Sequence, residues 1–489
     1  MKTFDDEIYQ KRQLELSNRM LENNCDLFFC PPSSDLEYLT GTLRRKPTFG
    51  NISYTHGWVC GAFFRPFETP LFVLPRMVAE FDMPYGATGE KVIINESDDG
   101  NVVFEKIIKG FGKLNKIAVE QRTWAETTLN ISKYSKAMLY NGVSLTNPMR
   151  RKKTDEEITL IREACRLADI SMEKITRTVV EAENEREISE ELDHLLSLKG
   201  SRGVSFDTAV WAMGPSTDRD ASDRETNNII PEGSSLLFDF GAIINGYCSD
   251  FGRTLSVGEA DSELKEVYEI VIESARKGLS AVRPGALASD VDRATRKVIE
   301  DAGYGDKFRH RTGHCIGLDV HEYPFISEED DTPLEVGMTF TIEPSIFWPG
   351  RVGARIEDIV VVTETGGEKL NQYHEDFITV EKASAKLQSE GGCAHDKLDD
   401  VDHTHNHSLN MIAEKMIHEI AHELKRAFEE KDLKAIENIY SDDIVVWHNY
   451  DRINRNRNQS LESAKWVISE IENFSIDECS IFPIKGGFI

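Results

Sequence analysis

The sequence predicts a protein of several domains that mix helices and strands. An α/β domain is expected over residues 1–150 and an α+β domain over residues 151–385, followed by a short α+β segment over residues 409–489. A length of 489 residues corresponds to two to four domains of ordinary size. Apolar strand patterns alternate with amphipathic helix patterns up to about residue 385. The polar, histidine-containing stretch at 386–408 then indicates a linker.

The composition argues against several classes of protein. Hydrophobic residues make up 40% and charged residues 29%, as in soluble globular proteins. The net charge of −28 argues against nucleic acid or a membrane as partner, because both bind a cationic face. No apolar run reaches the roughly 18 residues of a membrane helix, and the first residues lack the apolar stretch of a secretory signal. The eight cysteines form no CxxC pair, so we expect reduced thiols and a cytoplasmic location.

The expected elements follow from apolar patterns and capping residues. An amphipathic helix over about 5–23 leads to an apolar strand at 25–30, and another apolar strand lies at 71–75. The second domain opens with a helix whose start is set by the capping box of Thr154 and Glu157.

Two more helices are expected beyond a central hairpin. One covers about 261–282. The next begins with a capping box at Ser289 and Asp292 and ends at Gly303. Strands over 308–363 complete the domain.

The hairpin is the most informative segment, because it places two carboxylates side by side. Asn-Gly at 245–246 is the preferred two-residue type I′ turn, so Ile244 pairs with Tyr247. The same register makes Asp239 the diagonal neighbour of Asp250 on one face of the sheet. Three phenylalanines fall on the other face and can pack there: Phe238, Phe240 and Phe251. Burial of two adjacent carboxylates requires a cation, a shared proton or an arginine, and the alternative is a solvated hairpin face.

Further candidate ligands occur downstream. Glu343 lies in an otherwise apolar strand, where its charge needs a reason. Each residue alone is ambiguous, because a lone histidine near glycines is more often structural than a ligand. The order Asp, Asp, His, Glu, Glu along the chain is far more specific. The downstream candidates are His310, His314, His321, Glu343 and Glu357.

These residues and their motifs resemble the pita-bread metallopeptidases, the family of methionine aminopeptidase, aminopeptidase P, prolidase and creatinase. GHCIGLDVHE at 313–322 matches the family's GHxxGLDVHE block, and GARIED at 353–358 matches GxRxED. The resemblance covers about residues 5–385 and includes LEYLTG and RRKKTDEEITLIREA. It implies a creatinase-like α/β N-terminal domain and an α+β pita-bread catalytic domain.

The resemblance also implies a set of metal ligands. Two divalent metal ions are expected, with manganese as the first choice and cobalt, zinc or iron as alternatives, because carboxylates dominate the set. Four carboxylates balance the charge of two such ions. Two ions about 3.5–4 Å apart can share a bridging water and lower its pKa enough to give hydroxide near neutral pH. The family's five ligands carry over to Asp239, Asp250, His314, Glu343 and Glu357.

The remaining site residues and the assembly are likewise implied by the family. Glu343 would move the proton between the water and the leaving amine. His321 would stabilise the tetrahedral intermediate. His310 and Arg355 match positions that line the site. A homodimer is implied, with the N-terminal domain of one subunit closing the site of the other.

Two departures from the family pattern concern the substrate and the metal. Xaa-Pro peptidases and creatinase usually carry another histidine shortly before the first aspartate, whereas no histidine occurs here between His194 and His310. Charged residues are candidates to occupy that space: Arg219, Asp220, Asp223 or Arg224. Gly252 stands where many members have threonine, which removes a hydroxyl that could bond to the metal cluster.

The C-terminal part carries weaker signals. His418 and His422 fit the HExxH zincin pattern, but the apolar stripe of their helix lies opposite, which favours a solvated face. A metal-gathering tract is the alternative to a solvated linker for the upstream histidines, His395, His403, His405 and His407. Residues 411–470 resemble the front of SnoaL-like domains, whose remaining strands are missing from this sequence, so we expect a truncated appended domain.

Three functions follow in order of preference. The first is an Xaa-Pro dipeptidase or aminopeptidase that cleaves small peptides with a dinuclear metal site. The second is a hydrolase of a non-peptide C–N bond in a small amido acid, as in creatinase and ectoine hydrolase, and the missing histidine motivates it. The third is a non-catalytic binding protein, although such members usually lose metal ligands and this sequence keeps all five.

Overall fold

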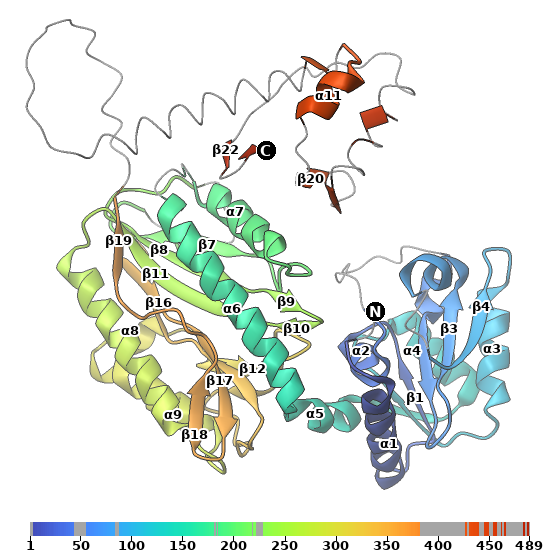
Figure 1. The fold of residues 1–489 in the computed structure, drawn as a ribbon. Coiled ribbons are helices and arrows are strands. Elements are labelled where there is room, and N and C mark those ends of the chain that lie inside the picture. Colours follow the sequence, from blue (N-terminus) through green and yellow to red (C-terminus); the bar gives the residue numbers. More distant parts are fainter. Residues whose placement is uncertain are drawn as a thin grey trace, which may run out of the picture. The chain divides into compact units, whose positions relative to one another are not determined.

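Figure 1 shows the fold as a computed structural model. The structure describes residues 3–43, 55–83, 88–179, 182, 184–217, 219–221 and 228–381, and short pieces between residues 426 and 488. The chain divides into two compact units, Met1–Ala385 and Lys386–Ile489. The first unit contains all the residues predicted for the site.

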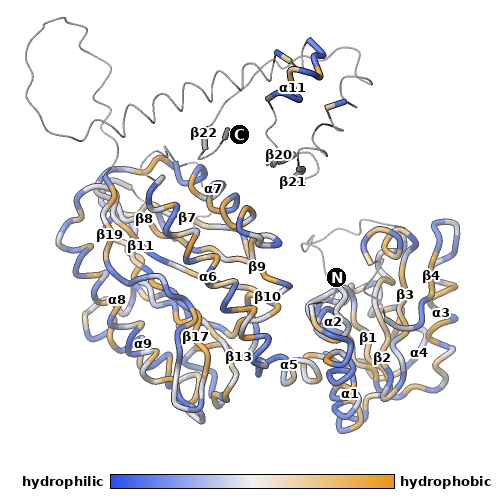
Figure 2. The backbone as a smooth tube through the Cα atoms, viewed as in Figure 1, coloured by the Kyte–Doolittle hydropathy of each residue, from blue (hydrophilic) through white to orange (hydrophobic). Residues whose placement is uncertain are grey.

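A six-stranded sheet forms the centre of the N-terminal domain. Its order is β4-β3-β2-β1-β5-β6, antiparallel at β1–β2 and β2–β3 and parallel elsewhere. The strands are β1 (Leu27–Cys30), β2 (Gly61–Phe64), β3 (Leu71–Pro75), β4 (Glu90–Ile94), β5 (Lys116–Val119) and β6 (Met138–Asn141). Every residue of β1 is buried, which explains its unbroken apolar run, visible as the hydrophobic centre of this domain in Figure 2.

The helices of the N-terminal domain lie around this sheet. They are α1 (Asp6–Glu22), α2 (Ser34–Thr40), α3 (Gly100–Gly110) and α4 (Ala125–Ser135), with short turns at Gly57–Val59 and Val78–Asp82. The helix predicted over 5–23 is confirmed by α1. The α/β character predicted for this part of the chain is also confirmed.

The helix α5 (Val143–Arg151) ends the N-terminal domain and leads into the second domain. The helices of the second domain are α6 (Asp155–Thr178), α7 (Glu185–Leu198), α8 (Ser262–Ala281) and α9 (Ala288–Asp301), with a short turn at Gly305–Lys307. The predicted capping box is present, because Thr154 Oγ1 accepts from the Glu157 backbone and Glu157 accepts from the Thr154 backbone. The helix predicted over 261–282 is confirmed by α8.

The capping box predicted at Ser289 and Asp292 is wrong. The backbone N–H of Leu287 donates to the Asp290 carboxylate at 2.9 Å, so α9 begins two residues earlier than predicted. Asp292 is buried and accepts from the backbone N–H of Thr312 at 3.0 Å instead. Two pairs of positions overlap here, Leu287 with Asp290 and Ser289 with Asp292, and the sequence pattern alone favoured the second pair.

The second domain contains two larger sheets. One has the order β19-β11-β8-β7, and the other the order β13-β12-β14-β17-β18. Buried residues of α6 and α7 pack on the first sheet, and residues of α8 and α9 pack on the other strands. The strands are β7 (Ala209–Met213), β8 (Ser235–Phe240), β9 (Ile243–Ile244), β10 (Tyr247–Cys248), β11 (Phe251–Val257), β12 (Gly313–Cys315), β13 (Glu322–Ile326), β14 (Thr339–Ile342), β15 (Ser345–Trp348), β16 (Val352–Arg355), β17 (Asp358–Thr363), β18 (Gly366–Lys369) and β19 (Ile378–Val380).

The predicted hairpin and its register are confirmed. Ile244 lies opposite Tyr247, and the same register continues to Asp239 opposite Gly252. The predicted phenylalanine face is also confirmed, because Phe238, Phe240 and Phe251 are fully buried in one apolar cluster. The Phe240 and Phe251 rings lie 5.5 Å apart between centroids.

The second unit is described only in short pieces. They are α11 (Leu433–Ile439), β20 (Val445–His448), β21 (Ile453–Asn456), β22 (Pro483–Ile484) and β23 (Gly487–Phe488). The candidate histidines at 395–422 lie outside the described residues. The resemblance to SnoaL-like domains stays a prediction.

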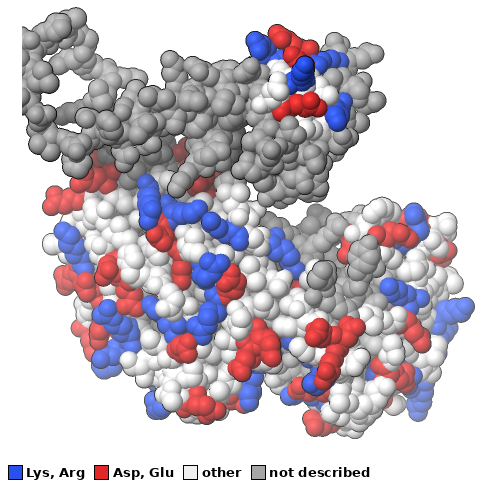
Figure 3. All heavy atoms as spheres, in the orientation of Figure 1, with Lys and Arg blue, Asp and Glu red and all other residues white. Residues whose placement is uncertain are grey.

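Surface and cysteine features complete the description. Figure 3 shows basic and acidic side chains interspersed over the face in view. Within the described part of the chain, no helix is both long and apolar enough to cross a membrane. The described cysteines are free and buried, in agreement with the expected reduced thiols: Cys25, Cys30, Cys60, Cys165, Cys248 and Cys315. The cytoplasmic location stays a prediction.

The hairpin turn provides a test of a close approach between the two domains. A Cβ atom at Gly246 (φ +93°) would lie 2.5 Å from Glu37 Oε1 and 3.0 Å from Leu318 Cδ2, whereas one at Gly285 (φ +83°) meets no atom within 4 Å. Gly285→Ala should cost about 1–2 kcal/mol of unfolding free energy for backbone strain alone. Gly246→Ala should cost at least about 1 kcal/mol more, because the methyl group overpacks the contact. Urea unfolding measures both, and equal losses would contradict the prediction.

Candidate metal centre

A pocket of about 730 Å³ is lined by residues of β7, β8, β12, β15 and β16 and of the segments beside these strands. It is lined by all eight residues predicted for the site, Asp239, Asp250, His310, His314, His321, Glu343, Arg355 and Glu357. These residues are up to 118 positions apart in the chain, and the fold brings them to one place.

The hairpin positions the two aspartates. Asp239 lies on β8 opposite Gly252, and Asp250 directly precedes β11. Both side chains are buried. The alternative of a solvated hairpin face is therefore wrong.

The second sheet supplies the other three candidate ligands. His314 lies in β12, Glu343 directly follows β14, and Glu357 directly precedes β17. Because β12, β14 and β17 are neighbours in one sheet, their ends bring these side chains together. Gly252 and Glu357 also exchange backbone hydrogen bonds of 3.3 and 2.9 Å, which fixes the two sheets against each other at the pocket.

Three of the five candidate ligands form the tightest group. Asp250, His314 and Glu357 each offer a ligand atom within 4.8 Å of the others. His314 Nε2 lies 3.3 Å from Asp250 Oδ2 and 3.5 Å from Glu343 Oε1, so Glu343 borders the group. His314 Nδ1 lies 3.2 Å from the backbone oxygen of Cys315, which orients the ring.

Arg355 contacts the two remaining carboxylates and also one carboxylate of this group. Its Nη1 lies 2.5 Å from Asp239 Oδ2 and 3.7 Å from Glu357 Oε2, and its Nη2 lies 3.7 Å from Glu343 Oε2. One guanidinium therefore faces three carboxylates. The single positive charge of Arg355 does not by itself balance four carboxylates.

The donor set fits divalent cations. Asp250 Oδ1 and Glu357 Oε2 are buried and make no hydrogen bond. Burial and the neighbouring carboxylates raise the pKa of Glu357 well above its usual range, and burial raises the pKa of Glu343. Bare buried carboxylate oxygens at this spacing need a proton or a cation, and oxygen ligands with one imidazole suit manganese and related ions.

The three histidines differ in environment. Burial and Arg355 lower the pKa of His310 to about 3, and its Nε2 lies 2.5 Å from Ser345 Oγ. Partial desolvation and the adjacent His314 lower the pKa of His321 to about 4, although part of this residue is exposed. For His314, the contact with Asp250 and the charge of Glu343 outweigh burial and raise the pKa. His310 and His321 are therefore neutral near pH 7 and can donate or accept hydrogen bonds.

The structure places two of the four candidates for the absent histidine. Asp220 binds Arg309 at the pocket through two contacts of 2.9 and 2.5 Å. Arg219 instead binds buried Glu185 at 2.7 Å. Asp223 and Arg224 lie outside the described residues.

Gly252 allows a close approach to Glu357. A Cβ atom at position 252 would lie 3.0 Å from both Glu357 Cβ and Glu357 Oε2. The oxygen without a hydrogen bond is thus the one nearest the missing threonine side chain. The geometry agrees with the loss of a hydroxyl contact proposed from the sequence.

Several pocket residues were missed by sequence analysis. They are Phe206, Trp211, Arg309, Arg311, Val320, Phe347 and, behind His310, Ser345. The two arginines flank His310 in RHR, a signal that the sequence offered. The apolar residues of the pocket offered no such signal, because their strands and loops have the sequence patterns of an ordinary core.

Comparison with known proteins agrees with this geometry. The model of metallopeptidase family M24 matches residues 159–364. A protein of Bacillus subtilis is 35% identical over 332 residues, which are 67% of this chain and 91% of its own length. The chain belongs to metallopeptidase family M24.

Other M24-type relatives extend the likeness. The Xaa-Pro dipeptidase of Pyrococcus furiosus is 37% identical over 232 residues, 47% of this chain and 66% of that protein. The crystal structure of a prolidase from Thermococcus sibiricus superposes with a TM-score of 0.70 at 28% identity, covering 77% of this chain and all of that one. The predicted creatinase-like N-terminal domain and pita-bread catalytic domain are confirmed, and the chain is a metallopeptidase by family.

Charge crowding in the pocket predicts opposite effects of two buried Glu→Gln changes. Glu357 has a raised pKa, so the folded protein binds this proton more tightly than the unfolded chain and loses stability as the pH rises above the unfolded pKa. In EDTA at pH 7.5, Glu357→Gln should therefore raise the Tm by about 2 °C or more. Glu322→Gln should lower it, because Arg150 and Lys153 outweigh burial and hold the pKa of Glu322 below its usual range.

Added metal should reverse the order of the wild-type and Glu357→Gln Tm values. With added manganese, the wild-type Tm should rise and the Glu357→Gln Tm should change little, because one ligand charge is gone. Differential scanning fluorimetry measures all these midpoints. A fall in the Glu357→Gln Tm in EDTA would show that the carboxylates are not the source of instability.

Proposed function

We propose that the chain is an Xaa-Pro peptidase that cleaves the peptide bond before proline and uses two divalent metal ions. The observation that carries the proposal is the convergence of four buried carboxylates and three histidines in one pocket. The likeness to proteins named Xaa-Pro dipeptidase and prolidase supports the substrate class.

The proposed ligands are those expected from the sequence, Asp239, Asp250, His314, Glu343 and Glu357. Manganese is the metal that we propose, with cobalt, zinc or iron as alternatives. When bound, the ions would supply Lewis acidity toward a water and the scissile carbonyl. Because Arg355 binds Asp239 and faces Glu343, its guanidinium is proposed to orient these two carboxylates as ligands.

Glu343 and His321 are the proposed proton carrier and oxyanion donor. Glu343 Oε1 accepts from Thr341 Oγ1 at 3.2 Å, which holds one oxygen and leaves the other toward the pocket. Glu343 would take the proton of the attacking water and deliver it to the leaving amine. His321 is neutral and lines the pocket, so its ring N–H can donate to the developing oxyanion.

The remaining lining suits a proline-containing substrate. Trp211, Phe206 and Phe347 offer an apolar wall for the pyrrolidine ring. His310 is held by Ser345 and lies 3.4 Å from Arg355 Nη2, and both side chains lie against the Phe347 ring. The pocket thereby offers apolar and polar groups to a short peptide.

A second candidate function is hydrolysis of a non-peptide C–N bond in a small amido acid. The observation that favours it is the Asp220–Arg309 pair at the pocket. Asp220 belongs to the segment before Asp239, in which Xaa-Pro peptidases usually carry a histidine. A carboxylate–guanidinium pair presents charges of both signs to an incoming ligand. Such a rim can select a small zwitterion.

The homodimer expected from the family belongs to the same proposal. Light scattering during size-exclusion chromatography tests it, with a mass of twice 55.4 kDa as the expected result.

Proline release from Xaa-Pro dipeptides and longer Xaa-Pro peptides tests the activity. Manganese-loaded wild type should release proline, and Glu343→Gln should lose about 10²–10⁴-fold in kcat because a proton carrier and a ligand charge are removed. Glu368→Gln is the control, since Glu368 is half exposed on β18 and binds Arg162. Release from dipeptides only indicates a prolidase-like specificity.

Two outcomes would contradict the proposal. Full activity of Glu343→Gln would exclude its assigned role. No proline release by protein that binds two metal ions, together with turnover of a small amido acid, would select the second candidate function.

A further inference from the structure

A cluster of buried charges joins the N-terminal domain to the loop that carries His321. At its centre is Arg150 at the end of α5, whose side chain is only 9% exposed. Its Nη1 lies 2.6 Å from Asp35 of α2, and its Nη2 lies 2.8 Å from Asp319 and also binds Glu322. One guanidinium thus binds one carboxylate of α2 and two carboxylates close to His321.

Further contacts close the cluster. Lys153 Nζ lies 3.0 Å from Glu322 Oε2, and Arg122 Nη1 lies 3.0 Å from Asp319 Oδ1. Ser34 Oγ donates to Asp319 and accepts from Arg150 at 3.1 Å. Three cations therefore meet three carboxylates, so each buried charge has a partner of opposite sign.

The two carboxylates of the loop stand on either side of His321. β12 and β13 pair Cys315 with Glu322, so residues 316–321 form the loop between these strands. Asp319 precedes His321 by two positions, and Glu322 follows it directly. Arg150 binds both, and the loop is held at two points on the two sides of the histidine.

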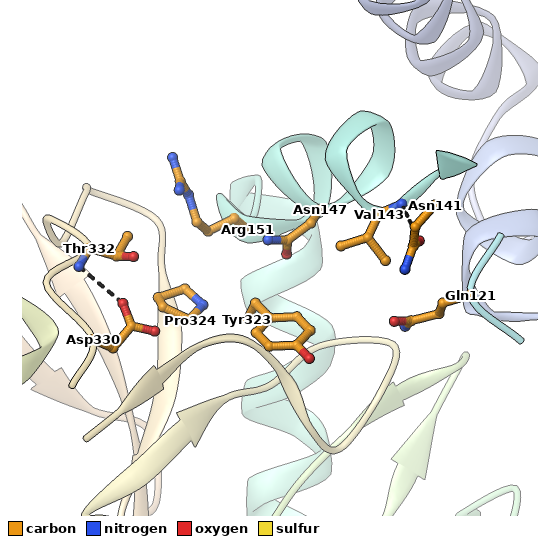
Figure 4. A pocket seen from close by; sticks show the side chains of 9 residues that line it. All are labelled: Gln121, Asn141, Val143, Asn147, Arg151, Tyr323, Pro324, Asp330 and Thr332. Carbon is orange, nitrogen blue, oxygen red and sulfur yellow. Dashed lines mark hydrogen bonds between the residues drawn. The ribbon is translucent and has the colours of Figure 1, made fainter. Parts of the chain in front are cut away.

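This position of the loop is what brings His321 to the metal centre. The His321 ring lies 4.2 Å from the His314 ring between centroids, in an edge-to-face arrangement. Figure 4 shows the neighbouring contact, where Val143 and Asn147 of α5 point toward Tyr323, the residue after Glu322. A polar pocket of about 270 Å³ lies there, outside the ion cluster.

A second buried arginine provides a comparison. Arg12 of α1 binds Glu157 of α6 at 3.0 Å and donates to the backbone oxygen of Tyr38 at 3.0 Å. It also connects the N-terminal domain to the catalytic domain through a buried ion pair. Its partners are in α2 and α6, away in sequence from the His321 loop.

We propose that Arg150 is a positioning residue that fixes His321 in the site through Asp319 and Glu322. The inference rests on the proposed role of His321 in the proposed function. The N-terminal domain then contributes to catalysis within its own subunit, because α2 and α5 hold a loop of the catalytic domain. Loss of Arg150 should affect turnover rather than substrate binding, since His321 is assigned to the oxyanion.

A double-mutant cycle tests this assignment. Arg150→Met should lower kcat for proline release by about 10–100-fold, as for other residues that orient a site group, with KM within about threefold. Arg12→Met, the matched control, should leave kcat within about threefold of wild type. In a His321→Ala background, Arg150→Met should have no further effect on kcat, because the group that it positions is gone.

A spectroscopic readout separates this proposal from the proposed function. Zinc-loaded protein labelled at histidine ¹³Cε1 gives one ring signal per histidine, and His321→Ala assigns the signal of His321. That signal should shift in Arg150→Met and in Asp319→Asn but not in Arg12→Met. If wild type releases no proline, the proposed function fails while this measurement still decides the positioning role.

Three results would overturn the proposal. One is an unchanged His321 signal in Arg150→Met. Another is an equal loss of kcat in Arg12→Met, which would indicate a general effect of domain contact. The third is a full effect of Arg150→Met in the His321→Ala background. Should Arg150→Met fail to fold, Asp319→Asn carries the same cycle, because it removes one loop charge and keeps the side-chain shape.

Discussion

Mutual repulsion of four buried carboxylates is the constraint on which the rest of the catalytic domain depends. Asp239, Asp250, Glu343 and Glu357 line one pocket and are all buried. Burial and proximity raise the pKa of Glu343 and Glu357, so the folded state keeps these groups together against their electrostatic preference. Either the packing of the two sheets supplies the free energy that holds these carboxylates together, or a bound cation offsets their repulsion.

The fold meets this constraint by fixing the backbone at the pocket more firmly than the side chains. The Gly252–Glu357 hydrogen bonds join the two sheets beside the carboxylates. Arg253 donates to the backbone oxygen of Glu357 at 2.9 Å and binds Asp358 at 2.7 Å, so a second buried cation braces the same junction from behind. Arg355 is the described arginine whose guanidinium lies within 4 Å of Asp239, Glu343 and Glu357. These contacts hold the backbone that carries the five candidate ligands around one pocket.

Local chemistry explains which parts were predictable from the sequence. The Asn-Gly turn and period-two alternation determine the register that puts Asp239 beside Asp250, and both signals lie within 12 residues. The start of α6 was predictable because Thr154 and Glu157 satisfy each other's backbone N–H. At α9 the same reasoning failed, because Asp290 competed with Asp292 and tertiary contact with Thr312 decided between them.

Long-range contacts explain what remained out of reach. That His314, Glu343 and Glu357 meet depends on strand order in one sheet, which the motifs implied only through a family resemblance. The Arg355 contacts and the Asp220–Arg309 pair are tertiary, and no spacing rule predicts them. Arg150 reads in the sequence as one more basic residue of RRKK, and its partners Asp35 and Asp319 are 115 and 169 positions away.

The Arg150 cluster gives the N-terminal domain a physical reason to be retained with this catalytic domain. The first half of the 316–321 loop is bound by strands, through Thr339 at Ile316 and Cys248 at Gly317 and Leu318. The second half must place one imidazole against a crowded metal site, and Arg150 binds the carboxylates on both sides of it. Buried charges are well suited to that task, because an ion pair out of water tolerates little displacement before its partners are left uncompensated. The same physics thus acts twice in this chain. The unbalanced charge of the carboxylates favours the binding of cations in the pocket. The balanced ion pairs beside the pocket hold the loop rigidly, so that His321 is directed toward those cations.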